Sequence, residues 1–390
     1  MLLLIFSYEL EFYSTLFSHT SMAASAPPED WPRPSLCPGP QDENARRTEA
    51  WRAERCKQRM ESLDYRDVVC SPSFVLYVDP RRRFFVVNKP AGMYVEDVLI
   101  VIERYMEDIR KEREGGGETK RAKFPGGSCH EAFRSLASVE ERFQLSHRLD
   151  RDTTGCLGVA CDKEMNRILS RAFQEGRVKK RYVAHCMNTH LAGMENSGRG
   201  WKDWKEWTPL HNDGSAELIT WPQRFMNHSL ECHTGHGRSK HGLWRLYTKE
   251  DVGRALPGGS KVKEMRTNLY YGFPTPKTMK RHARLREMPS FPVVAEPLTG
   301  RTHQIRMHCA QYFPIVGDYK YGYDDSSKDG VELEERRKGY RLHSCVLKLP
   351  VGGESDDEGV RVLAPPPSWW DATEWGDYDV EVIKCHCEGL

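Results

Sequence analysis

The sequence has no marked excess of either charge sign and no long apolar run. Its 58 Lys and Arg and 56 Asp and Glu residues give a formal net charge of +2 over 390 residues. The overall charge therefore does not indicate a nucleic-acid binder, and any such surface must come from local clusters. The first residues are apolar, but Glu9 and Glu11 interrupt them before a bilayer could be crossed. We expect no transmembrane helix, and neither a secretory signal nor an organellar transit peptide fits this stretch.

Paired cysteine spacings are also missing. The 12 cysteines are irregularly spaced in a chain too large to need disulfides for stability, which favours free thiols in a reducing, intracellular compartment. The cytoplasm is slightly favoured over an organelle. The residues closest to a zinc set are Cys232, His233, His236 and His241, with Cys385 and Cys387 as outside candidates. The first four have no second Cys at a suitable spacing, so we expect no metal site.

Composition along the chain suggests one large central domain with additions. Hydrophobic residues make up 38% of the sequence, enough for a large core. We expect a flexible, partly helical extension over 1–71, a main domain over 72–350 with a long insertion at about 193–286, and an acidic extension over 351–390. Apolar periodicity and turn residues predict the following elements: helices at 48–60, 98–113, 138–143 and 163–175, two strands joined by a turn within 74–95, and a strand carrying Tyr182.

The long insertion is rich in Trp, Gly, His and basic residues. Its most distinctive part runs from Cys232 to Arg245, where glycines stand beside Arg238, Lys240 and Trp244. Such a loop suits contacts to phosphates and stacking on a base, or it is a Gly-rich surface excursion. Both interpretations stay open. The same holds for the basic clusters, which are solvated faces or phosphate contacts: Arg81 to Arg83, Lys179 to Arg181, Lys277 to Arg286 and Arg336 to Lys338.

Five segments combine strand-like runs, glycine turns and charged side chains. They are residues 84–95 (FFVVNKPAGMYV), 147–160 (HRLDRDTTGCLGVA), 179–184 (KKRYVA), 300–308 (GRTHQIRMH) and 314–322 (PIVGDYKYG), the last followed by Arg341-Leu342-His343. An Asp in a turn, such as Asp150, is common because its side chain can bond the backbone. The five segments in this order are far more specific than any one of them.

Together these segments resemble the motifs of the RluA-type pseudouridine synthases, which convert uridine in RNA into its C-glycoside isomer. The resemblance implies an isomerase of the EC 5.4.99 class that acts on a specific uridine, with tRNA or rRNA favoured as substrate. It implies an α+β fold with a mixed, mostly antiparallel sheet, flanking helices and a central cleft. It also implies no cofactor, because the reaction needs no redox step, phosphate or metal. We expect a monomer with no obligatory protein partner and no membrane association.

The same resemblance assigns three catalytic residues. Asp150 corresponds to the catalytic carboxylate, and it must be ionised for any of the chemical steps under debate for the family. Arg306 would keep it ionised, since a guanidinium grips a carboxylate with two bonds and does not lose its charge. Arg301 could do this in principle. Tyr182 would stack on the uracil ring, although an ordinary half-buried strand tyrosine is the alternative.

Further residues are assigned to RNA binding. Arg148 resembles the residue that enters the RNA stack when the uridine is flipped out, a movement required because the glycosidic carbon is inaccessible in a stacked strand. His147 is placed at the same site, although support of the loop backbone is favoured for it over catalysis. The remaining expected RNA-binding residues are Lys89, Arg301, His303 and Gln304.

Two other functions remain open. One is a catalytically silent RNA-binding protein of the same fold, which all the motifs fit except that the catalytic set is intact. The other is an unrelated hydrolase using Asp150 with His147 or His303, which no Gly-x-Ser-x-Gly or His-Glu-x-x-His motif supports. Thr154, Cys156 and Gly158 depart from the family pattern and affect the expected shape of the pocket.

Overall fold

The structure is a computed structural model of the chain. It describes residues 43–114, 128–139, 142–187, 228–238, 244–256, 259–271, 290–318, 320–321, 339–352 and 359–370, together with a few isolated positions. The basic clusters Lys277 to Arg286 and Arg336 to Lys338 lie outside these residues. Most of the two predicted terminal extensions and much of the predicted insertion do so as well.

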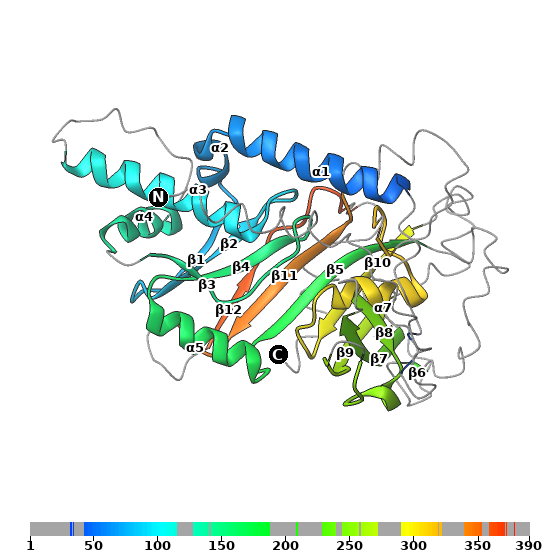
Figure 1. Cartoon of the computed structure of the whole chain (residues 1–390). Coiled ribbons are helices and arrows are strands. Elements are labelled where there is room, and N and C mark those ends of the chain that lie inside the picture. The colour runs from blue at the N-terminus through cyan, green and yellow to red at the C-terminus, as the bar shows by residue number, and fades with distance from the viewer. Residues whose placement is uncertain are drawn as a thin grey trace, which may run out of the picture.

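One mixed, mostly antiparallel sheet forms the centre of the molecule (Figure 1). Its neighbouring strands follow the order β1-β2-β4-β11-β5-β10-β9-β7-β6, with β12 pairing with β11, β3 with β4 and β8 with β7. The strands are β1 (Val75–Val78), β2 (Phe84–Lys89), β3 (Gln144–Leu145), β4 (Thr154–Ala160), β5 (Lys179–Met187), β6 (Thr208–Pro209), β7 (His228–Arg238), β8 (Trp244–Tyr247), β9 (Lys263–Tyr271), β10 (Ser290–Pro297), β11 (Leu342–Leu349) and β12 (Val360–Leu363). This sheet, with its helices, confirms the predicted α+β class.

The central pairing joins distant parts of the chain. β4 and β11 run parallel, with His343 opposite Thr154 and Ser344 opposite Gly155. Gly155 has φ +101°, and a Cβ there would lie 2.1 Å from the Ser344 carbonyl oxygen, so only glycine allows this approach. The strand that follows the Asp150 turn is thereby fixed beside the strand that follows the 314–322 segment.

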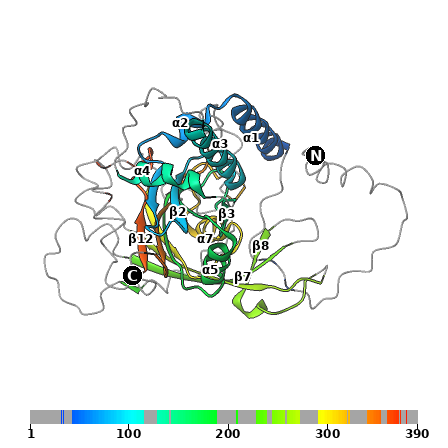
Figure 2. The same ribbon diagram turned by 90° about the vertical axis from the view of Figure 1, so that its left-hand side faces the viewer.

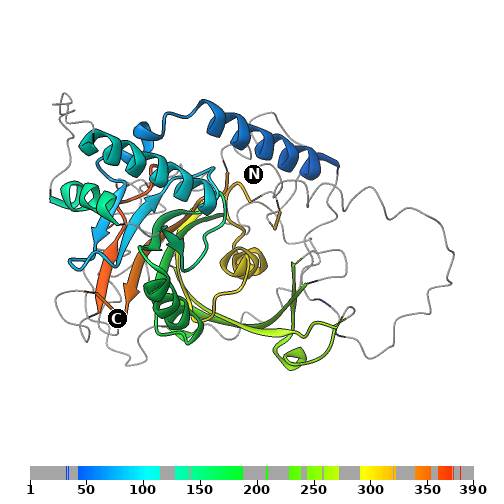
Figure 3. The same ribbon diagram turned by 60° about the vertical axis from the view of Figure 1, so that its left-hand side comes forward.

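The helices are α1 (Glu43–Ser62), α2 (Tyr65–Val69), α3 (Val95–Glu114), α4 (Ser128–Ser135), α5 (Lys163–Gln174) and α7 (Gln304–Tyr312). Helices α1 to α3 lie together along one side of the molecule (Figure 2). α7 lies inside the curve of the strands (Figure 3). Among the described residues, no helix combines the length and the apolar content needed to cross a bilayer.

The alternation of side chains along β2 divides this strand between two of the hydrophobic cores. On β2, Phe85 and Val87 join a core shared with α3 and α7, whereas Phe84 and Val86 join a second core shared with α5. The first core also contains the residues that flank the predicted catalytic positions, and it therefore positions the candidate site.

Most of the predicted elements are confirmed, with one correction. α1, α3, α5 and the strands β1, β2 and β5 cover the predicted ranges. The helix predicted at 138–143 is wrong, because α4 is followed by a short 3-10 turn at Leu136–Ser138 and Val139 is already extended. The carbonyls of Ala137 and Val139 accept from the Arg110 guanidinium at 2.8 and 3.1 Å, which replaces a continuing helical ladder. β12 lies within the predicted acidic extension, yet it pairs with β11 in the main sheet.

Candidate active site

Asp150 lies in a tight turn between β3 and β4. The backbone N–H of Thr153 donates to the Asp150 carbonyl at 3.1 Å, and Gly92 N–H donates to the Arg151 carbonyl at 3.1 Å. Lys89 Nζ donates to the carbonyls of Arg151 and Thr153 at 2.7 and 3.0 Å. The turn is thus held by its backbone, which leaves the Asp150 side chain 29% exposed.

Arg306 comes from the first turn of α7, far from Asp150 in the sequence. Its Nη1 donates to Asp150 Oδ2 at 3.1 Å. Its Nε and Nη2 form a two-bonded grip on Asp318 at 2.7 and 2.8 Å. The guanidinium is 5% exposed and Asp318 is 1% exposed. Asp318 therefore fixes the guanidinium and leaves one N–H aimed at Asp150.

The electrostatic balance favours an ionised Asp150. Burial opposes its charge, but His303 and Arg306 with the hydrogen bonds of Arg306 and Tyr340 outweigh burial, so the pKa of Asp150 lies below its usual value. Burial lowers the pKa of His303 to about 4. His303 is therefore neutral near pH 7, and Arg306 supplies the positive charge there.

His303 is the residue directly before α7, and it lies between Tyr321 and Asp150. It adopts the left-handed conformation, with φ 56° and ψ 21°, at the residue before the helix, which is strained for a residue with a side chain. Its Nδ1 lies 2.8 Å from the Tyr321 hydroxyl and its Nε2 lies 3.8 Å from Asp150 Oδ2. The tautomer that suits the carboxylate carries its proton on Nε2 and accepts from Tyr321 through Nδ1.

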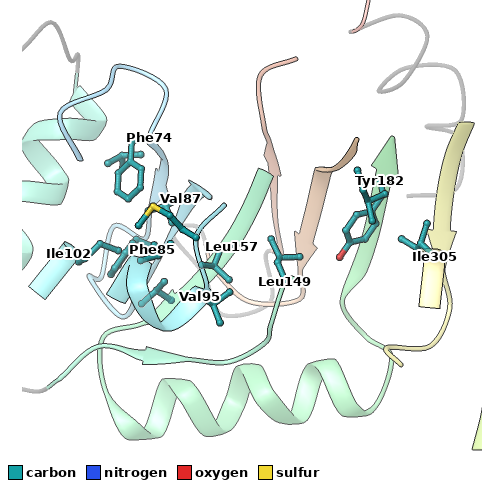
Figure 4. Close-up of a cluster of buried hydrophobic side chains, with 14 of the residues drawn as sticks. Phe74, Phe85, Val87, Val95, Ile102, Leu149, Leu157, Tyr182 and Ile305 are labelled. Atoms are coloured by element: carbon teal, nitrogen blue, oxygen red, sulfur yellow. The ribbon is translucent and has the colours of Figure 1, made fainter. Parts of the chain in front are cut away.

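Tyr182 lies on β5, beside Asp150 and Arg306. It is 9% exposed and belongs to the same core as Leu149 and Ile305, the residues that precede Asp150 and Arg306. Figure 4 shows these three side chains reaching toward one another from three elements, with the Tyr182 hydroxyl on the side of Leu149. Burial raises the pKa of Tyr182 well above its usual value, so the hydroxyl stays neutral.

Two of the predicted RNA-binding residues, Lys89 and Gln304, are engaged inside the protein. Lys89 is 0% exposed, burial lowers its pKa to about 7, and its ammonium donates to three carbonyls, the third being Pro90 at 2.9 Å. Gln304 uses its whole amide: Oε1 accepts from Thr299 Oγ1 and from the Arg301 N–H, and Nε2 donates to Arg266 O and Thr267 Oγ1. These bonds correct the expectation that Lys89 and Gln304 face RNA, because each already has its full set of partners.

His147 has a comparable supporting position. Its Nε2 accepts the backbone N–H of Gly158 at 2.8 Å, and its ring stacks on Phe173 with centroids 4.4 Å apart. Burial lowers its pKa to about 3, which keeps the imidazole neutral. The geometry suits backbone support of β4 rather than a contact to RNA.

Arg148 and Arg301 lie at the surface. Arg148 is 77% exposed and lies 3.4 Å from Glu96 at the start of α3. Arg301 is partly exposed, and its Nε donates to the Glu264 carbonyl at 2.9 Å. By contrast, Arg181 of the predicted basic cluster is 0% exposed and pairs with Glu296. That guanidinium belongs to the interior of the protein.

The β7–β8 hairpin contains the distinctive part of the predicted insertion. His236 stacks on Trp244 with ring centroids 4.7 Å apart, and the Arg238 guanidinium lies 5.5 Å from the Trp244 ring centre. His236 Nε2 also lies 3.1 Å from the Thr302 carbonyl. The hairpin is thus attached to the segment that carries Arg306, and a contact with RNA stays a prediction. Among the described residues, no group of His, Cys, Asp and Glu side chains is suited to hold a metal ion.

Sequence reasoning gave no role to Asp318 or Tyr340. Asp318 stands in a segment that resembles the family, so a carboxylate beside a glycine turn was a usable signal. Tyr340 precedes β11, and its ring centre lies 4.1 Å from the Arg306 guanidinium. No sequence feature singled it out.

Comparison with known proteins identifies the family of the chain. Residues 83–311 match the family model described as RNA pseudouridylate synthase. RNA pseudouridine synthase 1 of Arabidopsis thaliana is 29% identical over 322 residues, covering 76% of this chain and 75% of the relative. RNA pseudouridine synthase 1 of Oryza sativa is 30% identical over 312 residues, covering 73% and 70%. A solved structure of human RNA pseudouridylate synthase domain containing 1 overlaps with 77% of this chain and 85% of its own at 23% identity and a TM-score of 0.43.

The match spans well over half of the chain and contains the motif turns and α7 up to residue 311. The alignments cover 75% and 70% of the length of these two relatives. The chain therefore belongs to the RluA-type family of RNA pseudouridine synthases, isomerases that act on RNA.

Proposed function

We propose that this protein isomerises a specific uridine with Asp150 as the catalytic carboxylate. The observation that carries the proposal is the partly exposed Asp150 carboxylate 3.1 Å from a buried guanidinium that Asp318 fixes from the other side. An ionised oxygen pair with access to solvent and a fixed positive neighbour can act on an extruded nucleoside.

The reaction divides among the three residues. The bond from N1 to the ribose breaks, the base turns while it stays bound, and the ribose carbon bonds to C5, which then loses its proton. Asp150 would act at the sugar or the base, and Arg306 would keep it negative throughout. Tyr182 would stack on the uracil ring at the edge of the core, and its neutral hydroxyl would take part in moving the C5 proton.

A surface for the RNA strand lies next to this site. The exposed Arg148, two residues before Asp150, is free to leave Glu96 and fill the space of the flipped base, since an exposed ion pair contributes about 0–1 kcal/mol. We propose tRNA or rRNA as the substrate and a monomer as the active form. Mass measurement of the purified protein by light scattering tests the monomer.

The decisive experiment measures tritium release from RNA labelled at C5 of uridine. Separate reactions contain bulk tRNA or bulk rRNA, each with the wild-type protein, Asp150→Asn and a control, Asp162→Asn. Asp162 caps α5 by accepting the Met165 N–H, outside the site, and asparagine caps helices as well as aspartate. We expect release with wild type and Asp162→Asn and none with Asp150→Asn.

RNA binding without tritium release by the wild-type protein would instead identify a catalytically silent binding protein. Cleavage of the RNA would favour the hydrolase interpretation. Full activity of Asp150→Asn would contradict the assignment of the catalytic residue while leaving the family unchanged.

A further inference from the structure

Tyr340 touches both halves of the catalytic pair. Its ring centre lies 4.1 Å from the Arg306 guanidinium carbon, closer than the ring of Tyr321 at 5.2 Å. An aromatic face at this distance attracts a guanidinium and limits its rotation. Asp318 holds the edge of the guanidinium and Tyr340 lies against its face, so the N–H aimed at Asp150 has little freedom.

The hydroxyl of Tyr340 reaches the other half. It lies 3.3 Å from Thr153 Oγ1, in the turn whose first residue is Asp150, and it is among the groups that lower the pKa of Asp150. Tyr340 is 5% exposed, and its contact with Thr153 is therefore shielded from competing solvent.

The backbone places Tyr340 there with little freedom. Gly339 has φ 93° and Gly317 has φ 79°. A Cβ on Gly317 would lie 2.4 Å from the Gly339 carbonyl oxygen, so the two chains approach as only glycine permits. The Arg341 N–H donates to the Val316 carbonyl at 3.1 Å. These contacts fix Tyr340 next to Asp318.

We propose that Tyr340 is a positioning residue of the reaction, whose ring holds the Arg306 guanidinium and whose hydroxyl holds the Asp150 turn through Thr153. This inference rests on the proposed role of Asp150. It adds a residue that joins the loop and the helix of the site. Without it, Asp318 alone would hold Arg306, and Thr153 would lose its contact with the hydroxyl.

The proposal predicts how Asp150 titrates. A hydrogen bond given to the ionised form favours that form. The pKa of Asp150 is below its ordinary value of 3.8, so wild-type activity should persist down to about pH 4. Removing the hydroxyl should move the loss of kcat/KM to higher pH. The groups that act on Asp150 from the surrounding elements are His303, Arg306, Tyr340, Lys89, Tyr182 and Tyr321.

The experiment compares the pH dependence of kcat/KM for Tyr340→Phe, Tyr340→Leu and a matched control, Tyr270→Phe. The Tyr270 hydroxyl donates to the Glu296 carboxylate at 3.1 Å, outside the site. The Phe variant keeps the ring on Arg306 and should shift the acid limb upward by about one pH unit. The Leu variant also loses the ring and should show at least the same shift with about tenfold lower kcat at the plateau. The control should keep the wild-type profile.

A folded Tyr340→Phe with the wild-type acid limb would overturn the proposal, as would equal shifts in Tyr340→Phe and Tyr270→Phe. Should Tyr340→Phe fail to fold, Thr153→Val replaces it, since it removes only the hydroxyl that contacts Tyr340, and an unshifted limb there would overturn the proposal. Asp150→Asn, measured in parallel, distinguishes a failure of the role of Asp150 from a failure of the role of Tyr340. Full activity in that variant contradicts the role of Asp150, whereas inactivity of that variant with unshifted Tyr340 variants contradicts only the role of Tyr340.

Discussion

Residues 147–154 and residues 299–308 meet at the Asp150 carboxylate, but they are held in different ways. The first segment is a turn fixed through backbone carbonyls, with Arg148 77% exposed and Asp150 29% exposed. The second enters α7, where Gln304 and Arg306 are each 4% exposed. One segment therefore presents the proposed reacting and RNA-facing groups, while the other supplies a fixed positive charge.

This difference has a physical reason. A guanidinium that must stay opposite a carboxylate needs a second anchor, and burial strengthens the attraction only if all donors are paired. A carboxylate that must meet a substrate needs access, so its turn can only be held from behind. Substitutions in the two segments can test whether the helix segment contributes most to stability and the turn contributes most to the reaction.

Arg306→Met should have the largest effect. It leaves Asp318 and Asp150 close together without a positive partner, so the free energy of unfolding should fall by about 3–5 kcal/mol. Tritium release should fall at least about a thousandfold. Urea unfolding and the release assay measure both. Arg301→Met is the control for stability, because its Nε bonds a single carbonyl at 2.9 Å. An equal loss of unfolding free energy in Arg306→Met and Arg301→Met would show that the buried contacts of Arg306 add no more stability than the exposed contact of Arg301.

Asp150→Asn should separate chemistry from stability. Activity should fall at least about a thousandfold, with unfolding lowered by only about 1–2 kcal/mol from one charged hydrogen bond. The folded pKa of Asp150 lies below 3.8. Its ionisation therefore contributes stability above that value and loses it as the pH falls through the folded pKa. The difference in unfolding free energy between wild type and variant should shrink on acidification, and a widening difference would contradict the lowered pKa.

Gln304→Leu should affect the helix segment more than the chemistry. Four hydrogen bonds disappear, among them those to the buried Thr267 hydroxyl and the Arg266 carbonyl, so unfolding should be easier by about 1–3 kcal/mol. Activity at a temperature well below unfolding should fall much less than in Asp150→Asn. A variant as stable as wild type would show that the hydrogen bonds of Gln304 do not contribute to stability.

Arg148→Ala should have the smallest effect on the fold. An exposed side chain outside the core changes unfolding within about 0.5 kcal/mol. The value of kcat/KM for RNA should fall about tenfold, because a side chain that replaces the flipped base contributes a kcal/mol or more. Arg171→Ala is a control with a similarly exposed arginine, 74% exposed on α5. Equal activity in the two variants would argue against contact between Arg148 and RNA.

The motifs predicted much of the site because each contains its own local geometry. The turn at Asp150 and the strand of Tyr182 depend on glycines, apolar residues and short spacings, whereas the helix that starts at Gln304 was not predicted. Lys89 and Gln304 were placed in the right region with the wrong role. Their polar side chains suit RNA as well as buried carbonyls, and only the packed chain decides which partner they have.

By itself, the sequence determined the family and the class of fold, since those follow from ordered local patterns, and the same patterns led to the proposal of which segments carry the catalytic groups. Only the tertiary structure decided that Asp318 anchors Arg306, that His303 reaches Asp150 and that Tyr340 joins the loop to the helix. Each of these contacts is made between segments that the sheet brings together, with 156 positions between Asp150 and Arg306 and 187 between Thr153 and Tyr340. Such contacts depend on the register of β4 with β11 and on the close approach at Gly155, which no local pattern in the sequence specifies.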